Sequence, residues 1–194
     1  MLDNSKIKSY LEQALSEKRF VHSIGVAEEA VRLAEKFGAD TEKAYVAGLV
    51  HDVAKEIDAD SAREMLKERF GINVDPVTYN VPKLLHAPLG ACLAQTEFGI
   101  YDAEILDSIK YHTTAKAEMS LLTKIIYMAD YIEPNRTFEG VDELRREAYE
   151  DLDSAILTGL DFTVSELLED GKMFHPDTVH ARNYIILKRM SSKK

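Results

Sequence analysis

Six side chains of the types that bind metal ions lie in apolar surroundings along this sequence. In chain order they are His22, His51, Asp52, His86, His112 and Asp130. The local segments are "FVHSIGV", "GLVHDVA", "KLLHAPLG", "IKYHTT" and "IIYMADYI". A lone histidine in such a segment is usually a core residue that is hydrogen-bonded to a carbonyl group. Six of these groups would each need a separate buried partner, whereas one shared metal centre satisfies all of them, so we predict a metal centre.

The donor types and their spacing narrow the chemistry. Imidazole and carboxylate groups together suit iron, manganese, zinc or nickel, and the single cysteine, Cys92, excludes a thiolate cluster. Consecutive helical residues lie about 100° apart, so His51 and Asp52 can hold one ion from two sides, or Asp52 can bridge two ions. Lys55 projects over the same region, where its ammonium group can meet an anion bound to the metal. The alternative for Lys55 is a surface lysine paired with a nearby acidic group.

Composition limits the class of protein. The net charge of −10, from 24 basic and 34 acidic residues, disfavours binding to a nucleic-acid backbone, although cations in one pocket can still attract a small anionic substrate. The longest apolar run, "AYVAGLV", is far shorter than the roughly 20 residues that span a bilayer. No secretory pattern opens the chain, and one cysteine cannot form an internal disulfide. We therefore expect a cytoplasmic protein without a membrane partner.

The elements that position these residues are helices, which the periodicity of the apolar residues predicts. This periodicity predicts an all-α fold, a bundle of about eight to ten helices in a single domain over residues 1–194. The segment "GLVHDVAKEI" reads as the interior of one helix, because valine and isoleucine recur at helical spacing from residue 46 to residue 57. The segment "INVDPVTYNVPK" is expected to be a loop with one short turn. The residues expected to cap helices are Asp40, Asp60, Asp102 and Ser120.

The order of the six residues is similar to the ligand set of the HD-domain metal-dependent phosphohydrolases. The segments that resemble the YqeK-type members of this family are "KRFVHSIGVAEEA", "AGLVHDVAKE", "LLHAPLGA", "YHTT", "IIYMADYIEPNR" and "FHPDTVHARNY". Those members act as symmetrical diadenosine tetraphosphate hydrolases. A bare His–Asp pair is a weak signal, whereas six motifs in order at compatible spacing, from about Lys18 to Tyr184, are a specific one.

The resemblance implies an HD-type domain whose core covers about residues 18–184. The implied ligands of one iron ion, or of manganese or another divalent metal, are His22, His51, Asp52 and Asp130. Asp52 would bridge to a second ion on His86 and His112, unless these two histidines touch phosphate oxygens directly. The residues implied to be catalytic are Asp52, Lys55, His86 and His112.

Basic residues near these ligands are candidates for holding the rest of a polyphosphate. Arg136 in "EPNR" offers a guanidinium fork that suits phosphate oxygens. Arg19 and Lys83 each lie three residues before one of the histidines and share its helical face. The resemblance also implies a nucleotide contact at His175. The alternative is that His175 only forms the start of the last helix. The full candidate set for substrate binding is Arg19, Lys55, Lys83, His86, His112, Arg136 and His175.

The ligands and cations indicate hydrolysis of phosphate esters or anhydrides. The substrate comes from the resemblance alone: diadenosine tetraphosphate, a small nucleotide polyphosphate, cut in the middle to two ADP by a metal-bound hydroxide. The other readings are another nucleotide phosphohydrolase, a mixed-valent di-iron oxygenase on the same ligand set, or a non-catalytic nucleotide sensor. Missing "GYP" and P-loop motifs disfavour a cyclic-dinucleotide phosphodiesterase and a Walker-type enzyme. The sequence leaves a homodimer open.

Overall fold

The computed structural model describes residues 4–192, and within this range all regular secondary structure is helical. This confirms the all-α prediction. The α-helices are α1 (Asn4–Ala14), α2 (Glu17–Phe37), α3 (Thr41–Val50), α4 (Ala59–Glu64), α5 (Pro76–Asn80), α6 (His86–Phe98), α7 (Ala103–Tyr111), α8 (Leu121–Ile132), α9 (Val141–Glu150), α10 (Leu152–Glu169) and α11 (Pro176–Ser192). A π-helical turn, η1 (Met65–Arg69), extends α4, and a 3₁₀ turn, η2 (Pro82–Leu84), precedes α6.

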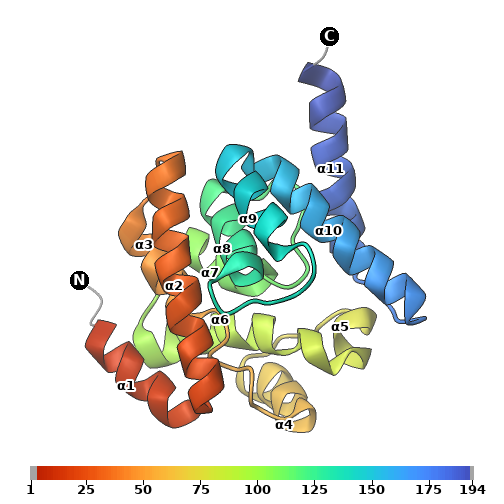
Figure 1. Ribbon diagram of the computed structural model, residues 1–194. Helices are drawn as coiled ribbons and strands as arrows, with labels where there is room; N and C mark the ends of the chain where they lie inside the picture. The colour runs from red at the N-terminus through yellow and green to blue at the C-terminus, as the bar shows by residue number, and fades with distance from the viewer. Residues whose placement is uncertain (1–3, 193–194) are drawn as a thin grey trace.

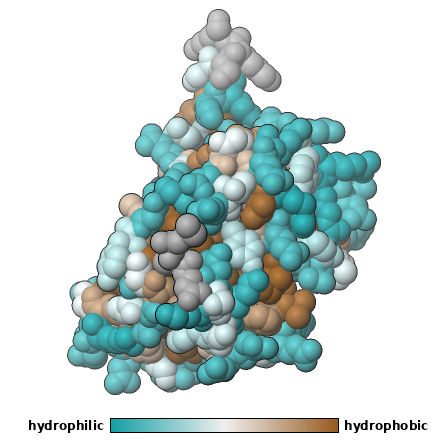
Figure 2. All heavy atoms as spheres, turned by 90° about the vertical axis from the view of Figure 1, so that its left-hand side faces the viewer, coloured by the Kyte–Doolittle hydropathy of each residue, from teal (hydrophilic) through white to brown (hydrophobic). Residues whose placement is uncertain are grey.

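Four helices form the centre of the bundle. The long helix α2 packs against α3 and α8, while α7 packs against α3, α6 and α8. Figure 1 shows α1 to α3 on one side, α4 and α5 at the base, and α11 running away from the body. The surface in Figure 2 is mainly hydrophilic, with apolar residues scattered between polar ones. Among the described residues, no helix is both long enough and apolar enough to span a bilayer.

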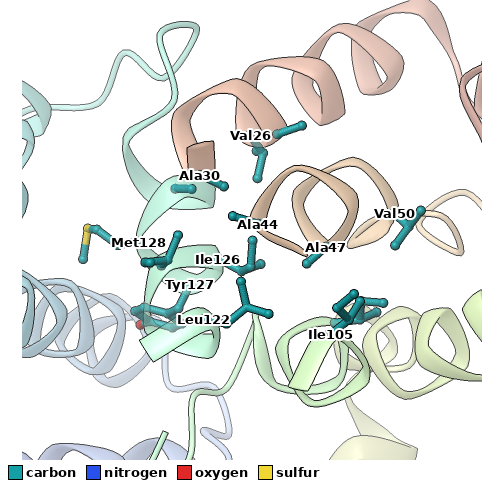
Figure 3. Packing of buried hydrophobic residues seen from close by; sticks show 14 of the residues in the cluster. Val26, Ala30, Ala44, Ala47, Val50, Ile105, Leu122, Ile126, Tyr127 and Met128 are labelled. Carbon is teal, nitrogen blue, oxygen red and sulfur yellow. The ribbon is translucent and has the colours of Figure 1, made fainter. Parts of the chain in front are cut away.

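Small residues bring α2 and α3 into close contact. Figure 3 shows Val26 and Ala30 of α2 next to Ala44 of α3, with Ala47 on the side of α3 away from α2 and side chains of α8 nearby. At Gly48, an added Cβ would lie 2.7 Å from the Cα atom of Ala27, so the two backbones nearly touch. This contact fixes the end of α3 against α2.

The segment that follows α3 differs from the predicted helix interior. The helix ends at Val50, and the next residues form tight turns in which each amide donates to the carbonyl three residues earlier: Val53 to Val50 at 3.1 Å, Lys55 to Asp52 at 2.8 Å and Ile57 to Ala54 at 3.2 Å. The His51 ring forms a hydrogen bond from its Nδ1 atom to the Gly48 carbonyl at 2.6 Å. The prediction that His51 and Asp52 lie inside a helix is therefore wrong, because this side-chain contact and the i→i−3 bonds replace the α-helical pattern.

Most helix starts follow the predicted capping chemistry. The confirmed caps are Asp40, Asp102 and Ser120, each of which accepts hydrogen bonds from amides of the first helical turn. Asp60 was expected to cap the following helix, but it lies inside the first turn of α4, and the extended residue Asp58 caps that helix. A shift of two residues is the usual error in a boundary that is set by local signals.

The expected loop at residues 72–83 contains the short helix α5. The Asp75 carboxylate accepts hydrogen bonds from the amides of Val77 at 2.8 Å and Thr78 at 3.1 Å, and Pro76 occupies the first helical position. An aspartate followed by proline is a helix-start signal, which the prediction of a loop overlooked.

The contact between α2 and α3 gives a first testable prediction. Gly48→Ala should lower the free energy of unfolding by about 1–3 kcal/mol, because its Cβ meets backbone atoms that cannot move aside alone. The matched control is Gly159→Ala in α10, where the nearest atoms lie at 3.8 Å and a change of zero to about 1 kcal/mol in favour of folding is expected. Urea denaturation measures both, and equal stability of the two variants would contradict the tight contact.

Candidate metal centre

The structure brings all six predicted ligand residues into one cluster from five parts of the fold. His22 comes from α2, Asp130 from the last turn of α8 and His86 from the first residue of α6, while the others directly follow α3 and α7. The five that are buried are His22, His51, Asp52, His86 and His112. The Asp130 side chain is 19% exposed and lies at the edge of the cluster. The helices therefore deliver these side chains to one place although 108 positions separate the first from the last.

The first group of donors has the spacing of ligands around one ion. The His22 Nε2 atom lies 3.0 Å from Asp130 Oδ1 and 3.8 Å from Asp52 Oδ2. The His51 Nε2 atom lies 3.6 Å from Asp52 Oδ2 and 4.0 Å from Asp130 Oδ1. Atoms that share an ion at about 2.1 Å lie about 3–4 Å from one another. These four residues thus surround a position of the right size for a metal.

The hydrogen bonds on the far side of each ring set its tautomer. His51 donates from Nδ1 to the Gly48 carbonyl at 2.6 Å, and His22 donates from Nδ1 to Glu133 Oε1 at 3.1 Å. When it is neutral, each ring presents the lone pair of Nε2 to the cluster, where neither atom has a hydrogen-bond partner among the described residues. Burial lowers the pKa of His22, but the nearby carboxylates of Asp130 and Glu133 outweigh this and raise it. Buried lone pairs that face carboxylate oxygens need a cation between them. The donor set fits a divalent metal.

A second group lies on the other side of Asp52. Its Oδ1 atom is 3.1 Å from His86 Nε2 and 3.4 Å from His112 Nε2, and the two imidazole nitrogens are 3.0 Å apart. Lys55 Nζ lies 3.0 Å from His86 Nε2 and 3.3 Å from Asp52 Oδ1. Asp52 therefore turns one oxygen to each group, which is the arrangement of a bridging carboxylate.

Burial and the neighbouring charges set the protonation states of the cluster. Burial lowers the pKa of His51 and of His86 to about 4, so both rings are neutral at pH 7. Burial raises the pKa of Asp52, but its interactions with His51, His112 and His86 outweigh this and hold it well below its usual value. Neutral imidazoles and ionised carboxylates are the forms that bind a metal.

Besides Lys55, two of the predicted basic residues lie at the cluster. Arg19 Nη1 is 3.4 Å from Asp52 Oδ2, and Arg136 forms an ion pair with Asp130 while its Nε atom donates to the Asp130 carbonyl at 2.7 Å. Both arginines line a cavity of about 740 Å³ whose wall includes His22 and the half-exposed ring of Phe138. The first group of donors therefore opens into a basic cavity.

The other two predicted residues lie further out. His175 lines a second cavity of about 520 Å³, with its Nε2 atom 3.0 Å from Asp75 Oδ2 and its Nδ1 atom accepting from the Asp177 amide at 3.1 Å. It thus also starts α11, as the alternative reading proposed. Lys83 is exposed in η2, where its charge acts on Asp170, and neither of these two cavities includes it in its wall.

Two chain neighbours of the second group of donors line the second cavity: Thr113, which follows His112, and Pro88, two residues after His86. Neither histidine is itself part of the wall. The rest of the wall combines apolar side chains with charged ones, among them Lys110, Asp75 and Asp177. The first cavity therefore includes a donor of the first group, His22, whereas the second includes only neighbours of the second group.

Three residues of the "EPNR" loop region were missed by the sequence analysis. Glu133 is buried beneath His22, and Asn135 donates to it from its amide and side chain at 2.8 and 2.9 Å. Arg145 of α9 donates to the carbonyls of Ile132, Glu133 and Arg136 at 2.8–3.0 Å. A glutamate and an asparagine beside a proline read as ordinary loop residues, and only their contacts give them a role.

Comparison with known proteins places the chain in a family. The model of the HD domain matches residues 19–135. The chain belongs to the HD-domain family.

Within this family, the chain is similar over nearly its whole length to proteins named bis(5'-nucleosyl)-tetraphosphatase, symmetrical. It is 39% identical to the one from Halalkalibacterium halodurans over 97% of this chain and 100% of that protein. It is 41% identical to the one from Bacillus subtilis over 91% of this chain and 94% of that protein. A crystal structure from Clostridium acetobutylicum, described as a predicted HD superfamily hydrolase involved in NAD metabolism, superposes with a TM-score of 0.94 at 45% identity, covering 97% of this chain and 99% of that one.

The contacts of Arg145 give a testable prediction. Arg145→Met should lower the free energy of unfolding by about 1.5–3 kcal/mol, because it leaves three main-chain carbonyls of the loop without their charged donor. Its neighbour Arg146 pairs only with the exposed Glu143 in this structure, so Arg146→Met should change the same free energy by less than about 0.5 kcal/mol. Chemical denaturation compares the two, and a small effect at Arg145 would refute its role in holding the loop.

Proposed function

We propose that this protein hydrolyses diadenosine tetraphosphate symmetrically to two ADP, as a metal-dependent HD-domain phosphohydrolase. The observation that carries the proposal is the cluster in which the Nε2 atoms of His22 and His51, both without a hydrogen-bond partner among the described residues, face carboxylate oxygens of Asp52 and Asp130 around one position. The similarity over nearly the full length to symmetrical bis(5'-nucleosyl)-tetraphosphatases supports the substrate.

The four residues of the first group would hold a divalent ion. When bound, this ion would lower the pKa of a coordinated water toward about 7 and offset the charge that grows on phosphate oxygens. Hydrolysis adds water to one inner phosphorus atom, breaks its bond to the central bridging oxygen and releases two ADP molecules. His86 and His112 would complete the site on the far side of Asp52, either as ligands of a second ion or as direct contacts to phosphate oxygens.

Cations of the chain would bind the polyphosphate. The ammonium group of Lys55 touches both His86 and Asp52, so it can place a positive charge on an oxygen of the phosphate that is attacked. Arg19 and Arg136 reach the carboxylates of the first group and face the larger cavity, where their guanidinium groups can turn to phosphate oxygens. These three cations offset the carboxylates of Asp52, Asp130 and Glu133, so a bound divalent ion would leave the site positive, which favours a polyanion over the organic substrate of a di-iron oxygenase.

The two cavities suit the two ends of a symmetrical substrate. The larger one combines Arg19 and Arg136 with the ring of Phe138, and the smaller one combines apolar side chains with His175. Since one cavity includes His22 and the other includes chain neighbours of His86 and His112, we assign one nucleoside to each and the central anhydride to the space over Asp52. We assign Lys83 no contact with the substrate in this arrangement.

We propose iron as the metal, with manganese as the alternative. Two histidines and two carboxylates without a thiolate suit both ions. We also propose that residues 1–194 form one HD-type domain, since one continuous core runs from Ile7 to Ile185. The first three and last two residues of that range lie outside the described part of the chain.

The products of the reaction test the function. The protein, purified without chelator under low oxygen, should convert diadenosine tetraphosphate to two ADP, and His51→Ala should lose this activity together with its metal. Anion-exchange chromatography separates the products, and metal analysis accompanies each assay. ATP plus AMP would refute symmetrical cleavage, and a metal-loaded protein without turnover would refute the substrate.

Lys55 has a prediction of its own. Lys55→Ala should keep the bound metal but lower turnover by about 10²–10³-fold, because it removes a charge that acts on the phosphate rather than a ligand. Lys67→Ala is the matched control, since Lys67 is exposed and pairs with Glu68 away from the cluster. Metal content and turnover are measured for both variants. Unchanged turnover in Lys55→Ala would end this assignment.

A further inference from the structure

Glu133 occupies an unusual position at the end of α8. It is 1% exposed, and its carboxylate lies between His22 and the loop that follows the helix. The Oε1 atom accepts from His22 Nδ1 at 3.1 Å. The Oε2 atom accepts from the backbone amide of Asn135 at 2.8 Å and from its side-chain nitrogen at 2.9 Å. Glu133 is therefore a buried acid whose two carboxylate oxygens accept hydrogen bonds from one histidine and from one loop.

The donors around Glu133 require a group that accepts at both ends. The backbone amide of Asn135 can only donate, so it always needs an acceptor at Oε2. The other side-chain atom, at the position of Oε1, must also accept a hydrogen bond if His22 is to keep its proton on Nδ1. Only a carboxylate meets both demands, because a glutamine in the same place would present an NH₂ group to one of the two donors.

We propose that Glu133 is a positioning residue that fixes the Nδ1–H tautomer of His22 and thereby presents the Nε2 lone pair to the metal. This inference rests on the assignment of His22 as a ligand in the proposed function. A neutral histidine carries one ring proton, so the hydrogen bond at Nδ1 decides whether Nε2 can bind a metal. Partners behind ligand histidines typically change metal affinity by about 10–100-fold.

An independent observation on α2 supports this role. A Cβ atom added at Gly25 would lie 2.7 Å from Glu133 Oε2 and 3.4 Å from Asn135 Nδ2. Gly25 lies one helical turn after His22, in the interior of a 21-residue helix where alanine is favoured over glycine. The space that Gly25 leaves open is filled by the carboxylate, so α2 is shaped to admit Glu133 beside His22.

The test compares Glu133→Gln with the parent protein. The backbone amide of Asn135 should draw the glutamine oxygen, which turns the NH₂ group toward His22 and moves the histidine proton to Nε2. We expect Zn²⁺ affinity, measured by chelator competition without any substrate, to fall about 10–100-fold. Nitrogen-15 NMR of histidine-labelled, metal-free protein in alkaline buffer should show the His22 proton on Nδ1 in the parent and on Nε2 in the variant.

A second variant perturbs the same carboxylate without removing it. Gly25→Ala should push Glu133 away from His22 and lower Zn²⁺ affinity in the same direction. The control is Glu29→Gln, which changes another buried acid of the fold that contacts Arg32 and Tyr149 instead of the cluster; its Zn²⁺ affinity should stay within about twofold of the parent. Circular dichroism and thermal unfolding verify that each metal-free variant is folded.

The possible outcomes separate this inference from the proposed function. Parent-like Zn²⁺ affinity in a folded Glu133→Gln, or an unchanged His22 tautomer, would overturn the role of Glu133. His22→Ala tests the ligand assignment itself and should abolish tight binding. If His22→Ala weakens Zn²⁺ binding and Glu133→Gln does not, the positioning role fails and the metal centre stands. If His22→Ala has no effect, the ligand assignment fails as well.

Discussion

The structure depends on one electrostatic constraint: buried lone pairs cannot face one another without a cation between them. The Nε2 atoms of His22 and His51 face oxygens of Asp52 and Asp130 and have no hydrogen-bond partner among the described residues. Burying these polar groups costs free energy unless a partner satisfies them. A divalent ion meets this need with a single group, so the fold is organised around a place for it.

The packing of the helices follows from that constraint. Alanine and glycine at the contact of α2 and α3 let His22 and His51 approach each other, because larger side chains would hold the backbones apart. His51 and His112 each follow the end of a helix and donate Nδ1–H to a carbonyl three residues earlier, at 2.6 and 2.7 Å. The same local geometry thus occurs twice and fixes both rings with Nε2 toward the cluster.

The loop after α8 connects the His22 and Asp130 side chains of the cluster to the larger cavity. Glu133 supports His22 from within the loop, Arg136 pairs with Asp130, and Arg145 holds the loop backbone through three carbonyls. The geometry of the cluster and the position of Arg136 therefore depend on the same few hydrogen bonds. Although the whole chain is acidic, Arg19, Lys55 and Arg136 lie at the cluster and offset its carboxylates.

The sequence by itself determined the helical fold, most helix starts and the six residues of the cluster, because periodicity, capping residues and buried histidines leave local signals. It did not reveal that α3 ends before His51, because the helical spacing of apolar residues continues beyond the end of the helix. The tight turns there are visible only from the hydrogen bond between His51 and the Gly48 carbonyl and from the i→i−3 backbone bonds. Nor did the sequence reveal Glu133, Arg145 or the exposed position of Lys83 outside both cavities. Those facts depend on which groups meet across the bundle, and only the tertiary structure decides that, because contacts between distant segments leave no periodic trace in the chain.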